Sequence, residues 1–374
     1  MYIRENSRIY PKRFQQRTLN QWLGNARFCW NHFLNENIKR YEKEKKFVFY
    51  SETANLLVSL KKEEETKWLN ESVAQTLQQK LKDLDSALKQ SFKKSKNQKG
   101  FPRFKSKNTD TSGIRFPQGY KVDFEHNLIK LPKLDGWIKT KFSRRINGIP
   151  KSLTLYKDCV GDWFISIVYE IDEKYFEPKV KEIKNAVGID LGIKSFAVTS
   201  DSEVIQNPKF LRKTEKRLKK IQRKHSKKVK GSNNRFKSRK RLAKVHRKIK
   251  NQRTNFIKQV ASLKAKENDL IVVEDLNVKG MVKNHHLAKS ISDCGFSMFV
   301  KELEWQCLKR GKVFHKVSRW YPSSKTCNHC GYVKKELTLN EREWVCPQCN
   351  SVVDRDYNAS LNILKQGLKD LNIP

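Results

Sequence analysis

Four cysteines near the C-terminus have the spacing of a metal site. They follow the pattern Cys327-x2-Cys330-x15-Cys346-x2-Cys349. Four thiolates in two CxxC pairs suit one tetrahedral Zn²⁺, with each pair supplying half of the ligands. Two redox-active pairs or two disulfides are alternatives that fit less well in a chain with no sign of export. Because four protein ligands close the site, the sequence predicts a structural zinc in a small ribbon.

Several acids stand at the ends of predicted elements and could do a different chemistry. Asp190 lies within the apolar stretch 187–198, VGIDLGIKSFAV, and Glu274 lies near the end of the apolar stretch LIVVEDL. Asp354 and Asp356 stand where a terminal helix begins, in VVDRDYNASLNIL. An ionised acid in a buried strand needs a partner, because its desolvation is costly. Asp190 is therefore either paired with a base, of which Lys194 is the nearest in sequence, or bound to a cation, and a third alternative is a strand-end Asp that caps a turn. Asp356 could be the N-cap of the last helix.

Three carboxylates that converge in a cationic protein would suit hard divalent ions. Strands that alternate with helices predict a mixed α/β sheet, in which strand ends and a helix start from distant positions can meet. Carboxylate oxygens are ligands that Mg²⁺ prefers. Two such ions, about 3.5–4 Å apart, activate water and stabilise the leaving oxygen in phosphodiester cleavage. We expect the glycines that flank Asp190, Gly188 and Gly192, to let ions and a phosphate backbone approach the strand.

The charge of the chain indicates its partner. The 374 residues carry 80 Lys+Arg against 39 Asp+Glu, a formal net charge of +41, and 37% of them are hydrophobic. The hydrophobic fraction indicates a folded protein. Because the positive charges repel one another, the chain is expected to bind a polyanion, which predicts nucleic acid as the partner, with an anionic membrane surface as the alternative. The chain has no apolar run of membrane-spanning length, and its N-terminus lacks the apolar core of a signal peptide. We therefore expect a cytoplasmic, nucleoid-associated protein.

One segment, 212–253, concentrates this charge. It holds 21 Lys/Arg and a single acid, Glu215. Apolar residues recur there at helical spacing, and the turn residues 231–234, GSNN, interrupt them, which predicts two long helices joined by a turn. A solvated helical face normally mixes signs of charge, so we interpret this hairpin as a phosphate-binding element whose affinity depends strongly on salt.

The remaining regions have their own patterns. Residues 14–92 are mostly of helical periodicity, whereas 113–180 show short alternating runs that predict an antiparallel β-domain, as a small barrel. The first ten residues are expected to form a short edge strand that ends at Pro11, and to supply one of the strands of this domain. The basic connector 93–110 contains aromatic residues, so it is either a solvated charge run or a site for phosphates and stacked bases. Residues 277–289 have the composition of a polar loop.

The segments GIDLGIKSFAVTSD, IVVEDLNVKGM, SRWYPSSKTCNHCG and DRDYNASLNIL, in this order, resemble the signature blocks of the TnpB family. These proteins are encoded by bacterial and archaeal insertion sequences and are related to compact type V CRISPR effector nucleases. RIYPKRFQQ, LQQKLKDLDSALKQSF, GFPRFKSK and the basic hairpin also fit, so the resemblance covers nearly the whole chain. Asn350 and Val353 stand where many members have Gly and His, and Lys258-Gln259 where many have His-Lys. None of these departures affects an acid or a cysteine of the predicted sites.

The resemblance implies an RNA-guided DNA endonuclease with a RuvC-like nuclease domain. Its guide RNA would come from the transposon end, and the protein would read a short transposon-adjacent motif on double-stranded target DNA while the guide reads the rest. The implied catalytic acids are Asp190, Glu274 and Asp356, holding two Mg²⁺. Asp356 is preferred to Asp354 because the family's third acid stands two residues before an Asn. The protein is expected to act as a monomer in its ribonucleoprotein, without a membrane.

The implied fold is multidomain α+β, with an RNase H-like α/β nuclease domain, a β-barrel wedge domain, a helical recognition lobe and a zinc ribbon. The expected boundaries are 1–10 and 96–182 for the wedge domain, 11–95 for the recognition lobe, 183–324 and 351–374 for the nuclease domain with its basic hairpin 211–255, and 325–350 for the ribbon.

Nucleic-acid contacts are expected along the helical lobe, the basic connector and the basic hairpin. The candidates are Tyr50, Gln78, Gln79, Lys82, Arg103, Lys105, Arg235, Arg239 and Arg253. Two other functions remain open at this point. One is a guided DNA-binding repressor without nuclease activity, and the other is a transposase or an accessory protein of one. Relatives that act as repressors have lost the acids, whereas all three acids are present here.

Overall fold

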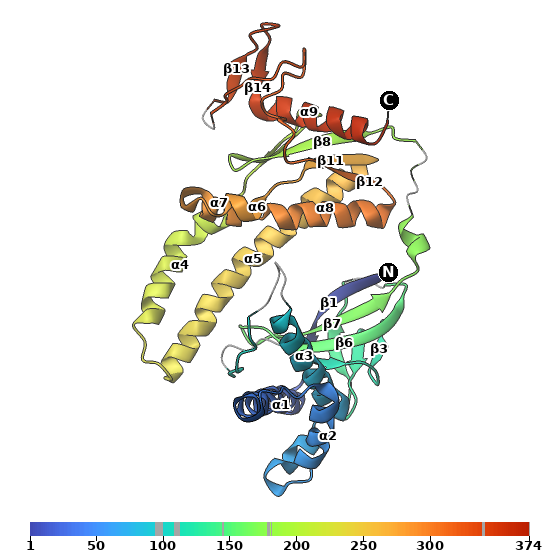
Figure 1. Ribbon diagram of the computed structural model, residues 1–374, viewed down its shortest axis with the longest axis vertical. Coiled ribbons are helices and arrows are strands. Elements are labelled where there is room, and N and C mark those ends of the chain that lie inside the picture. The colour runs from blue at the N-terminus through green and yellow to red at the C-terminus, as the bar shows by residue number, and fades with distance from the viewer. Residues whose placement is uncertain are drawn as a thin grey trace. The chain divides into compact units, whose positions relative to one another are not determined.

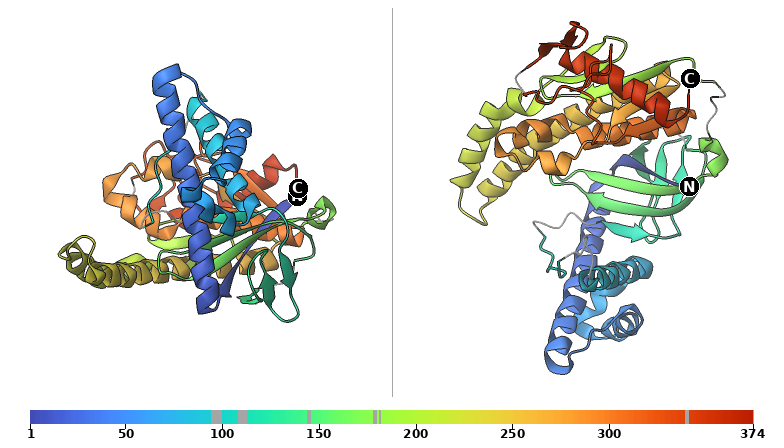
Figure 2. Two further views of the ribbon diagram at one scale, coloured as in Figure 1. Left: turned by 90° about the horizontal axis from the view of Figure 1, so that it is seen from below. Right: turned by 45° about the horizontal axis from the view of Figure 1, so that its top comes forward.

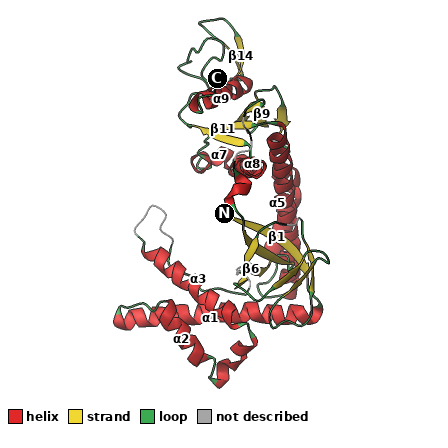
Figure 3. Cartoon of the chain, turned by 90° about the vertical axis from the view of Figure 1, so that its right-hand side faces the viewer, coloured by secondary structure: helices red, strands yellow, loops and turns green. Residues whose placement is uncertain are grey.

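The computed structural model describes residues 1–93, 100–107, 113–143, 146–177, 180, 182–338 and 341–373 (Figure 1). The chain forms two compact units, Met1–Asp172 and Glu173–Pro374. Figure 2 gives two further views of the elements, and Figure 3 colours them by type. None of the helices in the described ranges is both long enough and apolar enough to cross a membrane. The expected boundary between residues 95 and 96 lies outside the described residues.

A seven-stranded antiparallel sheet forms the centre of the first unit. Its order is β2-β6-β7-β1-β5-β4-β3. The strands are β1 (Tyr2–Tyr10), β2 (Ile114–Phe116), β3 (Lys121–Asp123), β4 (Leu128–Lys130), β5 (Ile138–Lys141), β6 (Ile149–Lys157) and β7 (Trp163–Glu170). The prediction that the first residues supply a strand is confirmed, but the expected edge position is wrong, since β1 pairs with β5 on one side and β7 on the other. The sheet is curled, but its edge strands β2 and β3 do not pair within the described ranges, so the predicted barrel is not closed there.

The helices of the first unit lie between β1 and β2 in the chain. They are α1 (Arg13–Glu44), α2 (Tyr50–Leu60), the 3-10 helix η1 (Glu64–Glu71) and α3 (Ala74–Phe92). Helix α3 buries one apolar stripe, which includes Leu77, Leu81 and Leu88, and packs against α1 and β2. The prediction of a mostly helical region from Phe14 to Phe92 is confirmed.

A mixed five-stranded sheet forms the centre of the second unit. Its order is β10-β9-β8-β11-β12, and β8, β11 and β12 are parallel. The strands are β8 (Ala186–Leu191), β9 (Ser195–Thr199), β10 (Val204–Gln206), β11 (Leu270–Glu274) and β12 (Val313–Val317). The helices are η2 (Glu173–Phe176), α4 (Phe210–Ser226), α5 (Asn233–Glu267), α6 (Val278–Met281), α7 (His285–Cys294), α8 (Phe296–Arg310) and α9 (Arg355–Asp370). The predicted mixed α/β sheet is therefore confirmed.

Helices cover both faces of this second sheet, because successive side chains of a strand point to opposite faces. Ile189 and Val273 pack with residues of α5 and α8 in one core. Val272 packs with Ile363 of α9 in another. Figure 1 shows α9 on one side of the sheet and α8 on the other. This arrangement brings the beginning of α9 beside the strands that carry two of the predicted acids.

Two glycines let α9 lie directly on the sheet. A Cβ atom at Gly188 would lie 2.2 Å from the backbone oxygen of Ser360, and one at Gly367 would lie 2.4 Å from the side chain of Val272. Both distances are far shorter than any side chain could tolerate. The expectation that Gly188 gives ions and phosphates access to β8 is wrong, because the space beside this glycine belongs to α9.

The basic hairpin consists of α4 and α5, which lie side by side (Figure 1). A narrow apolar stripe with Leu218, Val245 and Ile249 joins them, and Ser232 caps α5 by accepting a hydrogen bond from the Arg235 backbone N–H. Farther along α5, Ile257 is part of the sheet core. The prediction of two long helices joined by a turn is confirmed. In addition, the second helix connects the cationic hairpin to the core of the second unit.

Candidate functional site

The four patterned cysteines lie in two similar turns. The Gly331 N–H donates to the Cys327 carbonyl at 2.8 Å, and the Asn350 N–H donates to the Cys346 carbonyl at 2.8 Å. Gly331 has φ +80° and Asn350 has φ 56°, so each turn ends in the left-handed region. Asn tolerates this region better than most residues. Asn350 can therefore serve where the resemblance predicted glycine.

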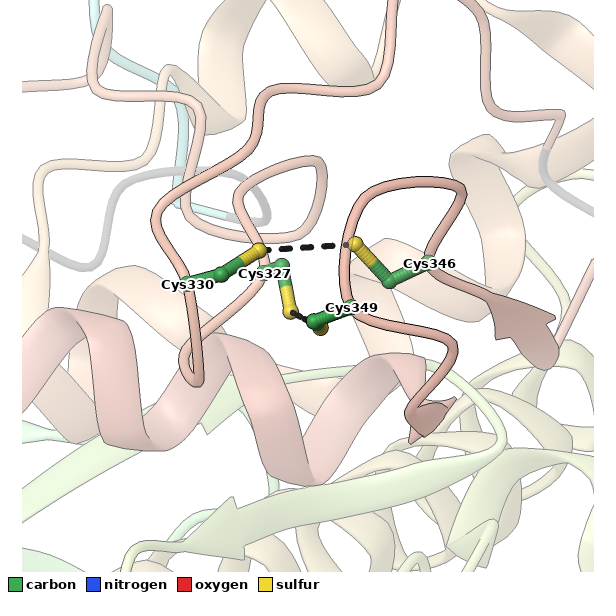
Figure 4. Close-up of side chains that lie close together, drawn as sticks. All are labelled: Cys327, Cys330, Cys346 and Cys349. Atoms are coloured by element: carbon green, nitrogen blue, oxygen red, sulfur yellow. Dashed lines mark hydrogen bonds between the residues drawn. The ribbon is translucent and has the colours of Figure 1, made fainter.

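The two turns bring the cysteine sulfurs together (Figure 4). Cys327 Sγ lies 3.7 Å from Cys349 Sγ, and Cys330 Sγ lies 3.6 Å from Cys346 Sγ. All four sulfurs lie within 4.8 Å of one another. A tetrahedral Zn²⁺ with bonds of about 2.3 Å separates its sulfur ligands by about 3.8 Å. The cluster thus has the donors and the dimensions to bind a metal such as Zn²⁺.

The cysteine turns lean on a small core. The short strands β13 (Glu343–Val345) and β14 (Val352–Asp354) pair beside them, and Trp344 and Val353 pack with the buried cysteines. The Asn358 side chain of α9 donates to the Thr326 carbonyl at 2.7 Å and accepts from the Asn328 N–H at 2.9 Å. Because so few apolar residues are buried here, a bound metal would supply much of the local stability.

The three predicted acids come from three elements of the second unit. Asp190 lies in β8, Glu274 is the last residue of β11, and Asp356 lies in the first turn of α9. Asp354 is the N-cap of this helix, since its carboxylate accepts a hydrogen bond from the Tyr357 N–H at 2.8 Å. The N-cap alternative for Asp356 is therefore excluded.

Asp190 interacts electrostatically with the other two acids. Burial, followed by the negative charges of Asp356 and Glu274, raises the pKa of Asp190 to about 7, although the charge of Arg355 opposes this shift. Burial also raises the pKa of Glu274, against a hydrogen bond from Ser323 that lowers it. Shifts of this kind arise where like charges are gathered in a place with little water. Perturbed acids of this kind concentrate at functional sites.

The acids nevertheless form a more open group than the cysteines. Within the described ranges, the cysteine cluster is the only group of three or more His, Cys, Asp or Glu whose ligand atoms all lie within 4.8 Å of one another. One carboxylate is also engaged elsewhere, because Arg342 Nη1 lies 2.9 Å and 3.2 Å from the two Asp356 oxygens. Sequence reasoning missed Arg342, which is one of many arginines and stands in no recognisable pattern.

A loop after β12 borders the acids. β11 and β12 pair so that Glu274 stands opposite Val317. Arg319 forms an ion pair with Asp275, and Ser323 hydrogen-bonds Glu274. Ser323 and Arg319 stand within the block SRWYPSSKTCNHCG, but the pattern alone did not indicate what they contact. This loop thus supports the end of the strand that carries Glu274.

The cationic hairpin offers grooves lined almost entirely by basic side chains. Lys220, Lys224 and Lys227 line two adjoining grooves, one of which also includes Arg241. Such surfaces suit phosphate groups. Among the predicted contacts, Arg239 lies over the Phe236 ring at 5.2 Å.

Two predicted contact residues of the hairpin also hold the fold. Arg235 Nη1 donates to the carbonyls of His225 and Lys228, which closes the turn between α4 and α5. Arg253 Nη2 donates to Asp293 of α7 at 3.1 Å, and the same carboxylate accepts from the Leu211 N–H at 3.0 Å. The role of Arg235 and Arg253 in binding nucleic acid stays a prediction.

The predicted contacts of the first unit lie in two places, which are the helices α2 and α3 and the connector 100–107. Tyr50 begins α2, and Lys82 Nζ of α3 lies 4.9 Å from the centre of its ring. Gln78 is exposed and Gln79 half-buried on the same helix.

The connector residues 100–107 come after α3 in the chain and lie against α1 of the first unit. Arg103 is exposed, and its carbonyl accepts from the Trp30 indole N–H at 3.0 Å. Lys105 Nζ lies 3.7 Å from the centre of the Trp30 ring. These contacts hold the connector against α1.

Three family models match the chain. A model described as "Probable transposase" matches residues 166–285, one described as "Cas12f1-like, TNB domain" matches 296–363, and one described as "Helix-turn-helix domain" matches 1–46. The structure of this last region is a strand, β1, followed by the single long helix α1.

Curated proteins are similar over nearly the whole chain. A protein of Streptomyces pristinaespiralis named "Putative RNA-guided DNA endonuclease" is 35% identical over 96% of this chain and 88% of that protein. A protein of Escherichia coli (strain K12) with the same description is 33% identical over 96% of this chain and 90% of its own length. A "TnpB-like protein" of Acanthamoeba polyphaga mimivirus is 30% identical over 62% of this chain and 46% of that protein.

One solved structure is similar in fold. The protein in a cryo-EM structure of a Cas12f1–sgRNA–target DNA complex superimposes with a TM-score of 0.54, at 18% sequence identity, over 92% of this chain and 81% of that chain. At this identity the likeness concerns the fold, which is the mixed α/β, multidomain arrangement described above.

Proposed function

The chain belongs to the TnpB family, and we propose that it is an RNA-guided DNA endonuclease encoded by an insertion sequence. It would cleave target DNA next to a short transposon-adjacent motif, with a guide RNA derived from the transposon end. Relatives described as RNA-guided DNA endonucleases match 96% of its length. The observation that carries the proposal is the electrostatic coupling of Asp190 with Glu274 and Asp356, at the carboxyl ends of β8 and β11.

Asp190, Glu274 and Asp356 are the proposed catalytic residues, and they would hold two Mg²⁺. Their carboxylate oxygens are the donors that Mg²⁺ prefers, and the repulsion that raises the pKa of Asp190 is what a bound cation would relieve. When bound, the ions would activate water and stabilise the leaving oxygen of a phosphodiester. The acids of this chain would hold the ions, and Ser323 would hold the Glu274 carboxylate in place.

The cysteine cluster is proposed to hold one structural Zn²⁺. Its four thiolates leave no position for substrate, so the site would stabilise the ribbon without taking part in hydrolysis. Asn358 of α9 lies two residues after Asp356 and hydrogen-bonds residues of the ribbon. These contacts support a role of the ribbon in positioning Asp356, the third acid.

The proposed domains keep the expected boundaries. The nuclease domain would be RuvC-like and comprise 183–324 and 351–374, with the ribbon at 325–350. The wedge domain would comprise 1–10 and 96–182, and the recognition lobe 11–95. The basic hairpin would hold the guide–target duplex, because 21 Lys/Arg against one acid favour the release of many counterions from a nucleic acid.

The test combines RNA sequencing with cleavage. The protein is purified with its RNA, the RNA is sequenced, and a plasmid that matches the guide is offered with Mg²⁺. We expect the wild type to linearise the plasmid and Asp190→Ala to bind it without cleavage. Glu304→Ala, which removes an exposed acid of α8, is the matched control and should cleave normally.

Other outcomes of this test would favour a different function or contradict the proposed site. An intact plasmid with the wild type would favour the guided repressor, and strand-transfer products would favour a transposase. Cleavage by Asp190→Ala at the wild-type rate would contradict the assignment of the acids.

A further inference from the structure

One aromatic side chain near the acids is almost fully exposed to solvent. Trp320 has a relative exposure of 86%, more than any other large hydrophobic side chain among the described residues. Exposing a Trp forgoes the large gain that burial of its apolar surface would give. A side chain of this size in water is therefore a candidate contact for a partner.

Trp320 stands close to the acids because of the pairing of β11 and β12. Val317, the last residue of β12, is opposite Glu274. Paired strands lie about 5 Å apart, and the three residues from Val317 to Trp320 span at most about 10 Å. The Cα atom of Trp320 therefore lies within about 15 Å of that of Glu274, a distance that a few nucleotides cover.

The loop that carries Trp320 is held at both ends. Before it, Arg319 pairs with Asp275, the residue after Glu274. After it, the Tyr321 N–H donates to the Ser318 carbonyl at 3.0 Å, and the Asn362 side chain of α9 donates to the Ser323 carbonyl at 2.8 Å. The indole is thus presented from a fixed loop, and little conformational entropy would be lost when a ligand stacks on it.

The electrostatics of this edge explain why an uncharged anchor is useful there. Arg342 and Arg319 are each already paired with an acid, and without bound cations the three carboxylates repel a phosphate backbone. Base–aromatic stacking attracts a strand independently of charge and of sequence, since every base has a π-face. An aromatic side chain beside the acids can therefore hold a strand independently of the cations that the acids would bind.

We propose that Trp320 is a stacking platform for a base of the single DNA strand that is delivered to Asp190, Glu274 and Asp356. The proposal rests on the proposed nuclease function and adds a positioning residue to it. A nucleobase is favoured over an apolar protein surface because the flanking Arg319 is cationic and the whole chain carries a net charge of +41.

The first test is single-turnover cleavage of a guide-matched target by the purified ribonucleoprotein. Stacking on an aromatic side chain is worth about 1–3 kcal/mol per base, which corresponds to about 5- to 150-fold. We expect Trp320→Ala to slow cleavage by about 10-fold or more, while target binding through the guide and the zinc content stay unchanged. Trp320→Phe, which keeps a ring, should stay within about 3-fold of the wild type.

The matched control is Tyr175→Ala, which removes another exposed aromatic of the same unit, 58% exposed in η2. It should cleave like the wild type. A rate for Trp320→Ala equal to that of this control would overturn the proposal.

The second test identifies the stacked base. Single abasic nucleotides are placed in turn along the strand near the cleaved phosphate. At one or two positions the abasic site should slow the wild type by the same factor as Trp320→Ala and should have no further effect in that variant, since both changes remove one interaction. Fully additive effects at all positions would contradict stacking and point to a protein partner. The outcome is separate from the nuclease proposal, which fails only if the wild type does not cleave.

Discussion

The cysteine cluster and the acid group both contact the beginning of α9, yet they are built in opposite ways. The cysteine sulfurs lie 3.6 Å and 3.7 Å apart in pairs, in turns that backbone hydrogen bonds close within a few residues. The acids come from two strands and a helix, and the charges of Asp356 and Glu274 repel that of Asp190. The first site is preformed by local chain geometry, whereas the second depends on the whole sheet to hold like charges together.

This difference indicates which site stabilises the protein and which site takes part in the reaction. A closed set of four ligands gives its binding energy to folding. An open set of carboxylates holds unfavourable energy that a cation and a phosphate can release, which is a common property of active sites. The following predictions test this contrast, in order of decreasing effect.

Removal of zinc should have the largest effect. Apparent binding energies of structural zinc are about 10–16 kcal/mol in isolated fingers, so Cys346→Ser or a strong chelator should unfold the ribbon. Hydrogen exchange should rise across 325–350, and zinc content should fall. Cys159→Ser, which removes an exposed cysteine of the first unit, is the control. A protected ribbon without metal would show that the cluster is not a structural site.

Loss of one acid should stop the chemistry without unfolding the protein. Glu274→Gln keeps the shape of the side chain but removes a charged ligand, and we expect cleavage to fall by about 1,000-fold or more, which corresponds to about 4 kcal/mol. Thermal unfolding should change little. The control is Glu304→Gln, which makes the same type of change at an exposed acid of α8. Equal losses in both variants would argue against a special role of Glu274.

The repulsion among the acids should be visible in stability. The pKa of Asp190 is about 7 in the folded protein and about 3.9 in an unfolded chain, so the folded state binds more protons and loses stability as pH rises from about 4 to 7. Without divalent metal, Asp190→Asn should therefore stabilise the protein at pH 8 by on the order of 2 kcal/mol and have little effect at pH 4. Thermal or urea unfolding at both pH values measures this.

Asp201 provides a control of opposite sign. Burial raises its pKa, but a hydrogen bond from Thr199 and the charge of Lys264 lower this pKa by more, so that the net shift is downward. Asp201→Asn should therefore destabilise the protein at pH 8. If Asp190→Asn also destabilised the metal-free protein there, the acids would not be in mutual repulsion.

The smallest effect is expected from the link between the two sites. Asn358 is buried and joins α9 to Thr326 and Asn328. Asn358→Ala leaves the Asn328 N–H without its partner, whereas the Thr326 carbonyl still accepts a hydrogen bond from Asn362. The loss costs about 1–3 kcal/mol and should slow cleavage by about 10-fold while zinc stays bound. Gln366→Ala on the same helix is the control. Unchanged cleavage would mean that the ribbon and the acids act independently.

The sequence predicted the elements well where one local pattern decides them. The Cys spacing, the apolar runs of β8 and β11 and the helical stripe of α3 are such patterns. It was less informative where contacts between distant segments decide. Residues 277–289 were expected to be a polar loop, but most of them belong to α6 and α7, because Asp293 of α7 anchors Arg253 and the beginning of α4.

By itself, the sequence determined the family, the cationic character and the residue types of both candidate metal sites, because these depend on composition and on short-range order. The tertiary structure decided which of the neighbouring acids caps α9 and which lies beside Asp190. It also assigned Gly188 to the packing of α9, paired Arg342 with Asp356 and left Trp320 in solvent. These outcomes depend on the contact of β8, β11 and α9, which are far apart in the chain, so no local pattern could contain them.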